Sequence, residues 1–337
     1  MNPITHLDAN QTLRVQMQKD RNHMNTNQFV TVGATAFVVA FVGITPCAAH
    51  DQPTFTFTDI IVPGGEYPSA FGINNEGTIV GNFLDVNNPN LVGGFVLRKD
   101  LFTDVFLPAS VTTEAWVQGI NDLGTGVGPY FDSVGQIHSF LRTARGEIVY
   151  LPDAVASGAA PFTSIGRINN NNVAVGSAGA DLNNGSTFHG CLLHGGHYTL
   201  FDFPGAFGTY CEAINDHDQM VGWYLDAKGT AHGFLREGDH YRTVDVPGAL
   251  FTNVLGINNR GQMVGGYGSA ADNYVWHGFL LSAGVFTTVD FPGQEETGNV
   301  LWMINDHGEG VGTYANSNGA FSVTVLPPKC GKQSERR

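Results

Sequence analysis

The chain has 337 residues, a formal net charge of −14 and only 14% charged residues, against roughly 25% in an average soluble domain. The negative charge argues against nucleic acid and against anionic membrane surfaces, because both repel an acidic protein. Gly (44 residues) and Phe (23 residues) are abundant, which favours short strands joined by tight turns. We therefore expect an all-β protein with no nucleic-acid partner.

The N-terminal segment has the pattern of an export signal. Residues 29–46 are continuously apolar or small, and small residues follow them up to Ala49. Three basic residues precede the run: Arg14, Lys19 and Arg21. This order predicts a signal peptide over residues 1–49 with a long basic region, so that Met17 or Met24 is a candidate true start. The alternative is a retained membrane anchor, since the run approaches the length of a membrane span.

The remainder reads as one domain, residues 50–328, with a polar tail at 329–337. No later stretch is long and apolar enough to span a bilayer. We expect a monomer that is secreted, periplasmic or on the cell surface, with no membrane partner after cleavage. A disulfide between Cys47 and Cys330 is one option, and it fails if Cys47 leaves with the signal.

An internal repeat determines the predicted fold. The tripeptide Ile-Asn-Asn or Ile-Asn-Asp occurs six times, with its Ile at 73, 120, 168, 214, 257 and 304. Eight residues after each Ile stands a glycine that follows a valine: Gly81, Gly128, Gly176, Gly222, Gly265 and Gly312. A recurring unit of this length is typical of repeat architectures.

Each repeat reads as four short strands. In the fourth repeat we predict strands at 210–215, 219–225, 231–236 and 240–246, separated by turns rich in Asp and Gly. Four strands per unit of about 45 residues predict a six-bladed β-propeller. A parallel β-helix, whose coils are shorter, is the minor alternative.

The two ends of the domain predict a closed ring. Residues 55–62 match the fourth strand of the unit, and residues 321–326 match the third. We expect residues 55–62 to complete the last blade as its outermost strand, in one sheet with residues 300–326, because such closure removes an open sheet edge. The first strand of each unit is then the innermost.

A second recurring motif contains the step His-Gly-Phe or a variant of it. It is carried by His138-Ser139-Phe140, His232-Gly233-Phe234 and His277-Gly278-Phe279. With the Gly-Ile-Asn and Val-Gly steps around them, residues 55–326 resemble the HAF family of probable extracellular repeats. Repeats one, three and six depart from the motif at Gly93-Gly94-Phe95, His189-Gly190-Cys191 and Gly319-Ala320-Phe321. The resemblance implies an exported bacterial repeat protein and no established activity.

Most recurring polar residues are expected to be structural. The Asn of each Ile-Asn step forms a turn and satisfies nearby backbone amides. The histidines at 138, 189, 232 and 277 lie on separate blades, so we expect buried hydrogen bonds rather than a shared metal ion. The Asp residues after the second strand (Asp85, Asp132, Asp181 and Asp226) are turn formers.

Residues that differ between repeats are the candidate site. Asp122, Asp216, His217, Asp306 and His307 lie in turns after the first strand, and Tyr210 and Glu212 lie on that strand in the fourth repeat. They are expected near one mouth of the channel, where they could bind a polar ligand or a cation such as Ca²⁺. A solvated turn is the competing interpretation. We assign no catalytic, cofactor-binding or metal-ligating residue, because no known catalytic motif occurs.

Two functional hypotheses follow. The first is a non-catalytic exported scaffold that binds an extracellular glycan, peptide or other surface partner. The second is a metal-dependent propeller enzyme, either a lactonase-like hydrolase or a polysaccharide lyase. The second requires carboxylates and histidines from several blades to converge within reach of one metal ion.

Overall fold

The computed structural model describes residues 55–99, 101–112, 114–155, 157–270, 275–291, 298–316 and 319–326. The predicted signal peptide, the polar tail, Cys47 and Cys330 lie outside these residues. Within the described residues, no helix combines the length and hydrophobicity of a membrane span.

The first two repeats form one nine-stranded sheet. The strands of the first repeat are β2 (Gly65–Ile73), β3 (Ile79–Asp85), β4 (Val92–Arg98) and β5 (Leu101–Val105). Those of the second are β6 (Glu114–Ala115), β7 (Gly119–Ile120), β8 (Gly126–Phe131), β9 (Ile137–Arg142) and β10 (Ile148–Tyr150). A single parallel pair, Val92 with Glu114, joins the two halves.

Each remaining repeat has a four-stranded antiparallel sheet of its own. The third contains β11 (Phe162–Ile168), β12 (Ala174–Gly179), the 3₁₀ turn η1 (Gly185–Thr187), β13 (Phe188–His194) and β14 (His197–Phe201). The fourth contains β15 (Gly208–Ile214), β16 (Gln219–Leu225), β17 (Ala231–Glu237) and β18 (His240–Thr243). The fifth contains β19 (Phe251–Ile257), β20 (Met263–Gly268), β21 (Trp276–Ser282) and β22 (Val285–Val289).

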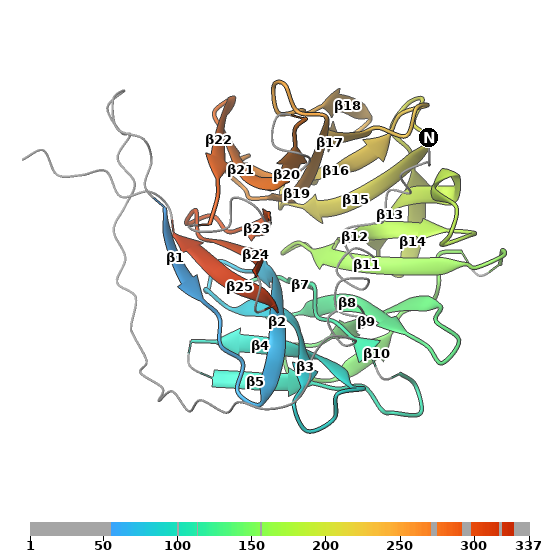
Figure 1. The fold of residues 1–337 in the computed structure, drawn as a ribbon. Helices are drawn as coiled ribbons and strands as arrows, with labels where there is room; N and C mark the ends of the chain where they lie inside the picture. Colours follow the sequence, from blue (N-terminus) through green and yellow to red (C-terminus); the bar gives the residue numbers. More distant parts are fainter. Residues whose placement is uncertain are drawn as a thin grey trace, which may run out of the picture. The chain divides into compact units, whose positions relative to one another are not determined.

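The last sheet contains both ends of the described chain. It consists of β23 (Asn299–Ile304), β24 (Gly310–Asn316), β25 (Gly319–Leu326) and β1 (Thr56–Asp59), in the order β1-β25-β24-β23. The register pairs Thr56 with Leu326 and Asp59 with Val323. The predicted closure by residues 55–62 is therefore confirmed, with β1 at the edge of the sheet (Figure 1).

The sheets follow one another around a common centre, and the fold is an all-β propeller (Figure 1). Four sheets are separate and four-stranded, which differs from the six separate sheets expected from the repeats. The difference arises in the first two repeats, where the chain after β5 runs alongside β4 before entering β8.

The strand boundaries predicted for the fourth repeat agree closely with β15 to β18. The main difference is the last strand, which ends at Thr243 rather than at residue 246. The backbone amide of Val244 still bonds to the Gly233 carbonyl at 2.8 Å. The chain then leaves the sheet at Asp245, whose carboxylate contacts His232 on β17.

The recurring Val-Gly step is explained by a close approach of the two inner strands. The first strand is bulged beside this step, as between Cys211 and Ala213 in the fourth repeat. A Cβ on Gly222 would collide with the backbone carbonyl of Tyr210, and the other five glycines of the repeat meet the same strand in the same way. Only glycine fits there, because it has no side chain.

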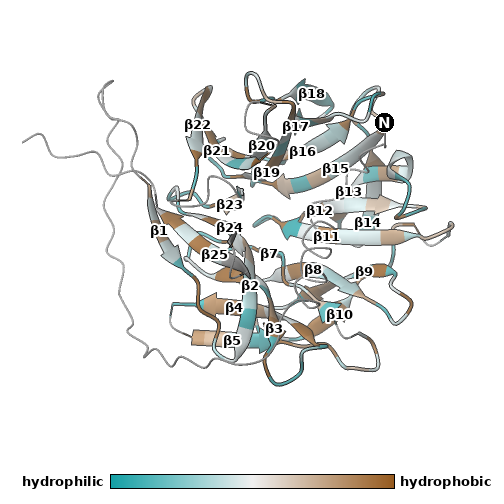
Figure 2. Cartoon of the chain, in the orientation of Figure 1, coloured by the Kyte–Doolittle hydropathy of each residue, from teal (hydrophilic) through white to brown (hydrophobic). Residues whose placement is uncertain are grey.

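The hydrophobic core lies between neighbouring sheets. Val80 and Val105 of the first repeat pack in one cluster with Val117 and Phe140 of the second. The phenylalanines of the second motif (Phe95, Phe140, Phe234 and Phe279) are fully buried, and Cys191 takes their place in the third repeat. Figure 2 shows hydrophobic residues interspersed with weakly polar ones along β4, β5 and β25. The His-Gly-Phe motif thus contributes a core side chain in these repeats, because the interior is close-packed and favours a large apolar ring at this position.

Adjacent isoleucines after β1 test whether this segment stabilises the closed ring. Ile60 is buried and its amide bonds to the Ser322 carbonyl at 2.8 Å, whereas Ile61 is 81% exposed. We expect Ile60→Ala to lower the free energy of unfolding by about 2 to 4 kcal/mol. Ile61→Ala should change it by less than about 0.5 kcal/mol. Urea denaturation measures both, and equal effects of the two substitutions would contradict the closure.

Candidate functional site

Six buried asparagines form a closed circle where the innermost strands end. Each donates its side-chain amide to the backbone carbonyl of the equivalent Asn in the next repeat, at 2.9–3.1 Å. The members are Asn74, Asn121, Asn169, Asn215, Asn258 and Asn305. The side-chain oxygen stays within its own turn; that of Asn215 accepts from the amides of His217 and Gln219. Each Asn thus shapes its own turn and links it to the next repeat.

The following residue in each repeat forms a second circle, in which Asn and Asp alternate. Its members are Asn75, Asp122, Asn170, Asp216, Asn259 and Asp306. The Nδ2 group of Asn170 donates to Oδ2 of both neighbouring aspartates, Asp122 at 2.8 Å and Asp216 at 2.9 Å. Asn75 and Asn259 do the same with their own neighbours. We call this second circle the Asn/Asp ring.

Backbone amides complete the Asn/Asp ring. The side-chain Oδ1 of each member accepts the backbone N–H of the preceding member at 2.7–2.8 Å. Each aspartate carboxylate therefore accepts three hydrogen bonds, two from side-chain amides and one from the backbone. The two circles surround a small opening of about 50 Å³. Charge-assisted hydrogen bonds of this kind are roughly twice as strong as neutral ones.

The structure brings three of the seven predicted site residues together. Asp122, Asp216 and Asp306 point into the Asn/Asp ring, although they come from three different repeats. The side chain of His217 is exposed outside the ring. His307 is half-buried in the corresponding turn of the last repeat, where its amide bonds to Asn305.

Tyr210 and Glu212 lie apart from the opening, further along β15. The ring of Tyr210 is buried and stacks on Trp223, with centroids 3.6 Å apart. The indole N–H of Trp223 donates to Glu212 at 3.1 Å. Neither residue lines the opening inside the two circles. A strand rises about 3.3 Å per residue. Tyr210 and Glu212 are therefore separated from the ring, because both lie several residues before Asp216 along the chain.

A buried arginine occupies the interior between the inner strands. Arg167 is 5% exposed, and its guanidinium donates to the carbonyls of Gln118 at 3.0 Å and Phe71 at 3.1 Å. Burial lowers the pKa of Arg167 to about 10, against the opposing effect of the Glu212 carboxylate. The group is therefore still protonated at neutral pH.

Sequence reasoning missed Arg167, although a signal was present. The position before the recurring Ile carries a small or apolar residue in every other repeat: Gly72, Gly119, Ala213, Gly256 and Met303. Arg167, with its long and positively charged side chain, therefore departs from the repeat pattern at this position. Its contact with Phe71, two repeats away along the chain, shows that the departure fills the centre of the fold.

Four of the recurring histidines pair with aspartates. In four successive repeats the His Nδ1 atom lies 2.8–3.0 Å from the carboxylate of an Asp that follows the fourth strand. The pairs are His138–Asp153, His189–Asp202, His232–Asp245 and His277–Asp290. The hydrogen-bonding prediction is correct, but burial is only partial, with 15–37% of each His side chain exposed.

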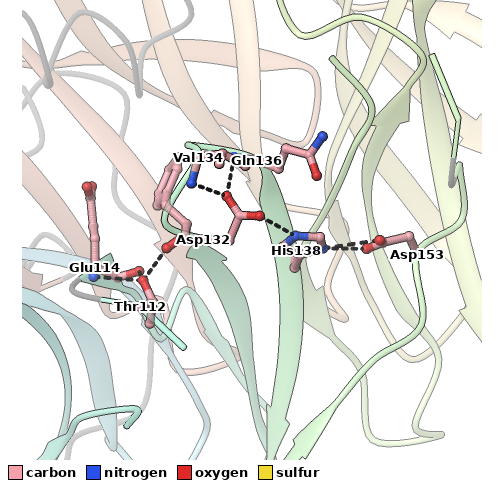
Figure 3. Close-up of polar contacts among 8 residues, drawn as sticks. Thr112, Glu114, Asp132, Val134, Gln136, His138 and Asp153 are labelled. Carbon is pink, nitrogen blue, oxygen red and sulfur yellow. Dashed lines mark hydrogen bonds and ion pairs between the residues drawn. The ribbon is translucent and has the colours of Figure 1, made fainter. Parts of the chain in front are cut away.

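The second repeat extends this pair to a second aspartate. In Figure 3, Asp132 lies on the opposite side of His138 from Asp153, with its Oδ2 atom 3.5 Å from Nε2. The same carboxylate accepts the backbone amides of Val134 and Gln136 at 2.9 and 2.8 Å. Asp132 is thus a turn former, as predicted, and also a partner of the histidine.

The pKa of Asp132 reflects these contacts. Burial acts to raise it and is the largest single influence, but the backbone amides of Gln136 and Val134 and the His138 imidazole together outweigh burial. The pKa therefore lies below its ordinary value. A carboxyl with a lowered pKa stabilises the folded state above its unfolded pKa, and this contribution is lost as the pH falls through the folded pKa.

A wider groove lies beside the Asn/Asp ring, between the first turns of the fourth and fifth repeats. Its volume is about 760 Å³, and its lining includes His217, Arg236, Glu237, Asn259 and Arg260. Among the described residues, no group of three or more His, Cys, Asp or Glu side chains is placed to hold a metal ion.

Comparison with known proteins shows the fold alone. No family model and no curated protein matches the chain. Among solved structures, AofleA from Arthrobotrys oligospora is similar, with a TM-score of 0.53 and 12% identity over 83% of this chain and 91% of that one. TolB from Acinetobacter baumannii has a TM-score of 0.51 and 8% identity over 76% and 65%. The fungal Aleuria aurantia lectin, a six-bladed β-propeller, has a TM-score of 0.47 and 10% identity over 82% and 100%.

Substitution within the Asn/Asp ring tests its alternation. In Asn170→Asp, a carboxylate replaces an amide between two other carboxylates, so two hydrogen bonds become like-charge contacts. We expect the free energy of unfolding to fall by about 3 kcal/mol or more. Asn87→Asp, in an exposed turn, should change it by less than about 0.5 kcal/mol. Chemical denaturation measures both, and an unaffected Asn170→Asp variant would contradict this account of the ring.

The lowered pKa of Asp132 predicts a pH-dependent effect. At pH 7, Asp132→Ala should lower the free energy of unfolding by about 1 to 2 kcal/mol, because it removes two backbone hydrogen bonds and the contact with His138. The deficit should shrink as the pH falls below about 4 and through the lowered folded pKa of Asp132, where the native carboxylate takes up a proton. Urea titrations at pH 7 and pH 3 measure it, with Asp104→Ala, at an exposed position of β5, as the control. A deficit of the same size at both pH values would refute the electrostatic explanation.

Proposed function

We propose that the chain is an exported, non-catalytic binding protein built as a six-bladed propeller. Each repeat contributes one blade, and the nine-stranded sheet counts as two blades joined by the single pair Val92–Glu114. The six-membered circles support this count, because every repeat contributes one residue to each circle. The resemblance to the HAF repeats and the apolar segment at 29–46 support export.

One observation carries the proposal: the rim around the Asn/Asp ring is far more varied than the ring itself, which contains only Asn and Asp. The residue after each ring member projects from the same turn, yet it differs between repeats in charge, size and polarity. These rim residues are Glu76, Leu123, Asn171, His217, Arg260 and His307. A fixed scaffold with varied loop residues is the arrangement on which binding sites are built.

The partner that suits this rim is an extracellular glycan or peptide. The rim combines hydrogen-bonding and charged groups with an exposed apolar side chain, Leu123, which is 58% exposed. Such mixed surfaces bind polar ligands through several weak contacts.

The alternative, a metal-dependent hydrolase or lyase, would use the three ring carboxylates. Their convergence favours it in part, and Ca²⁺ is the ion that carboxylate oxygens would suit. Each carboxylate already accepts three hydrogen bonds, however, so an ion would have to compete with amides that hold the repeats together.

Ligand arrays with the whole purified chain test the proposal. We expect binding to at least one glycan or peptide, unchanged by EDTA and without turnover of the bound ligand. Calorimetric titration with Ca²⁺ and Zn²⁺ after chelation is the matching control. Stoichiometric metal binding that Asp306→Asn abolishes would support the enzyme alternative. The absence of binding to any ligand on the arrays would contradict the binding hypothesis.

A further inference from the structure

We infer that the groove between the fourth and fifth repeats binds an acidic oligosaccharide, with a sugar carboxylate held by Arg236 and Arg260. The inference rests on the proposed binding function and names its ligand class and its site. The groove is bounded by the turn after β15, the turn after β19 and the end of β17. Its volume of about 760 Å³ lies in the range of ligand sites.

The groove concentrates positive charge in an acidic protein. The chain has 16 Lys and Arg residues against 30 Asp and Glu, yet two arginines and His217 line this one groove. On the rim, His217 and Arg260 occupy equivalent positions in adjacent repeats, and both side chains are exposed. The lining also contains Asp218 and Glu237, so its carboxylates equal its arginines in number, whereas the chain as a whole is strongly acidic. An anionic group is therefore repelled less in this groove than elsewhere on the surface.

Arg236 is held in place before any ligand arrives. Its guanidinium carbon lies 4.3 Å from the centre of the Phe201 ring and 5.5 Å from that of Tyr241. Its Nε atom donates to the Gly238 carbonyl at 2.8 Å. Stacking and this bond fix the plane of the guanidinium, which reduces the entropy lost when an anion binds.

The terminal nitrogens of Arg236 each have a partner at long distance among the described residues. Nη1 lies 4.0 Å from the Met220 sulfur, and Nη2 lies 4.0 Å from a carboxylate oxygen of Asp239, a fully exposed side chain. The side chain of Arg236 is 15% exposed, and its planar guanidinium can bind a planar carboxylate through two parallel hydrogen bonds when these long contacts are exchanged for the ligand.

The acidic groups in the groove distinguish a sugar acid from a simple polyanion. Glu237 accepts a hydrogen bond from Gln219 at 2.5 Å and is otherwise exposed, and Asp218 lies in the same lining. These carboxylates would repel a ligand that carries only negative charge, but they accept hydrogen bonds from hydroxyl groups. A uronic acid residue offers both a carboxylate and hydroxyls.

Calorimetric titration of the whole chain tests the inference with three probes. They are a galacturonic acid tetrasaccharide, a neutral tetrasaccharide and sodium sulfate. We expect the uronide to bind, the neutral sugar to bind about tenfold more weakly or worse, and sulfate not to compete at equal concentration. Uronide affinity should fall as salt is added, because the contact is ionic.

Exposed residues provide matched variants that should leave the fold intact. We expect Arg260→Gln to weaken uronide binding about tenfold or more, and His217→Ala to weaken it to a smaller extent. Arg242→Gln is the control, since Arg242 is an exposed arginine on β18 outside the groove lining. It should bind the uronide within about twofold of the unchanged chain.

Each contrary result has a distinct meaning. Equal binding by Arg260→Gln and Arg242→Gln would exclude this groove as the site. Equal affinity for the neutral sugar, or competition by sulfate at the same concentration, would overturn the ligand class. A glycan or peptide that binds the chain while the uronide does not would refute this inference and leave the proposed binding function standing. Silence with every ligand would remove both.

Discussion

The side-chain amide of one asparagine in each repeat holds the centre of this fold together. Its oxygen closes the turn after the innermost strand, and its nitrogen donates to the carbonyl of the same residue in the next repeat. Each of these carbonyls also accepts the backbone N–H of the residue three positions later in its own turn, as Asn215 does from Asp218. The amide from the neighbouring repeat is therefore a second hydrogen bond to the same buried oxygen, and it joins one turn to the next. The sixth such bond, from Asn305 to Asn74, spans 231 residues of sequence and makes the circle continuous.

Two levels of closure act on the same chain. At the edge of the last sheet, β1 pairs with β25 and joins the ends of the domain through a backbone ladder. At the centre, the two circles join all six repeats through side chains. The first kind of closure needs only extended backbone, but the second needs particular residues at fixed positions. That difference explains why the Ile-Asn step recurs so strictly while the edge strands vary in sequence.

Much of this architecture could be predicted from the sequence because it depends on local, repeated chemistry. The spacing of Ile-Asn and Val-Gly gave the strand order, and the strands of the fourth repeat agree within a few residues. The shared sheet of the first two repeats could not be predicted, since it depends on one tertiary pair, Val92 with Glu114. The sequence predicted that Asp122, Asp216 and Asp306 would lie near one another, but it did not predict that they belong to one hydrogen-bonded ring. Their alternation with Asn became apparent once the geometry showed which neighbours touch. Tyr210 and Glu212 lie on the first strand of the fourth repeat, as predicted, and their position along β15 decides their distance from the turns.

The alternation of the Asn/Asp ring constrains how such a chain can have grown. Each amide needs a carboxylate on both sides, and each carboxylate needs an amide on both sides. A circle with an odd number of members would place two like residues next to each other. Gaining or losing one repeat would therefore break the pattern, whereas gaining or losing two would preserve it. The alternation is therefore compatible only with an even number of repeats, and the present chain contains three Asn–Asp pairs.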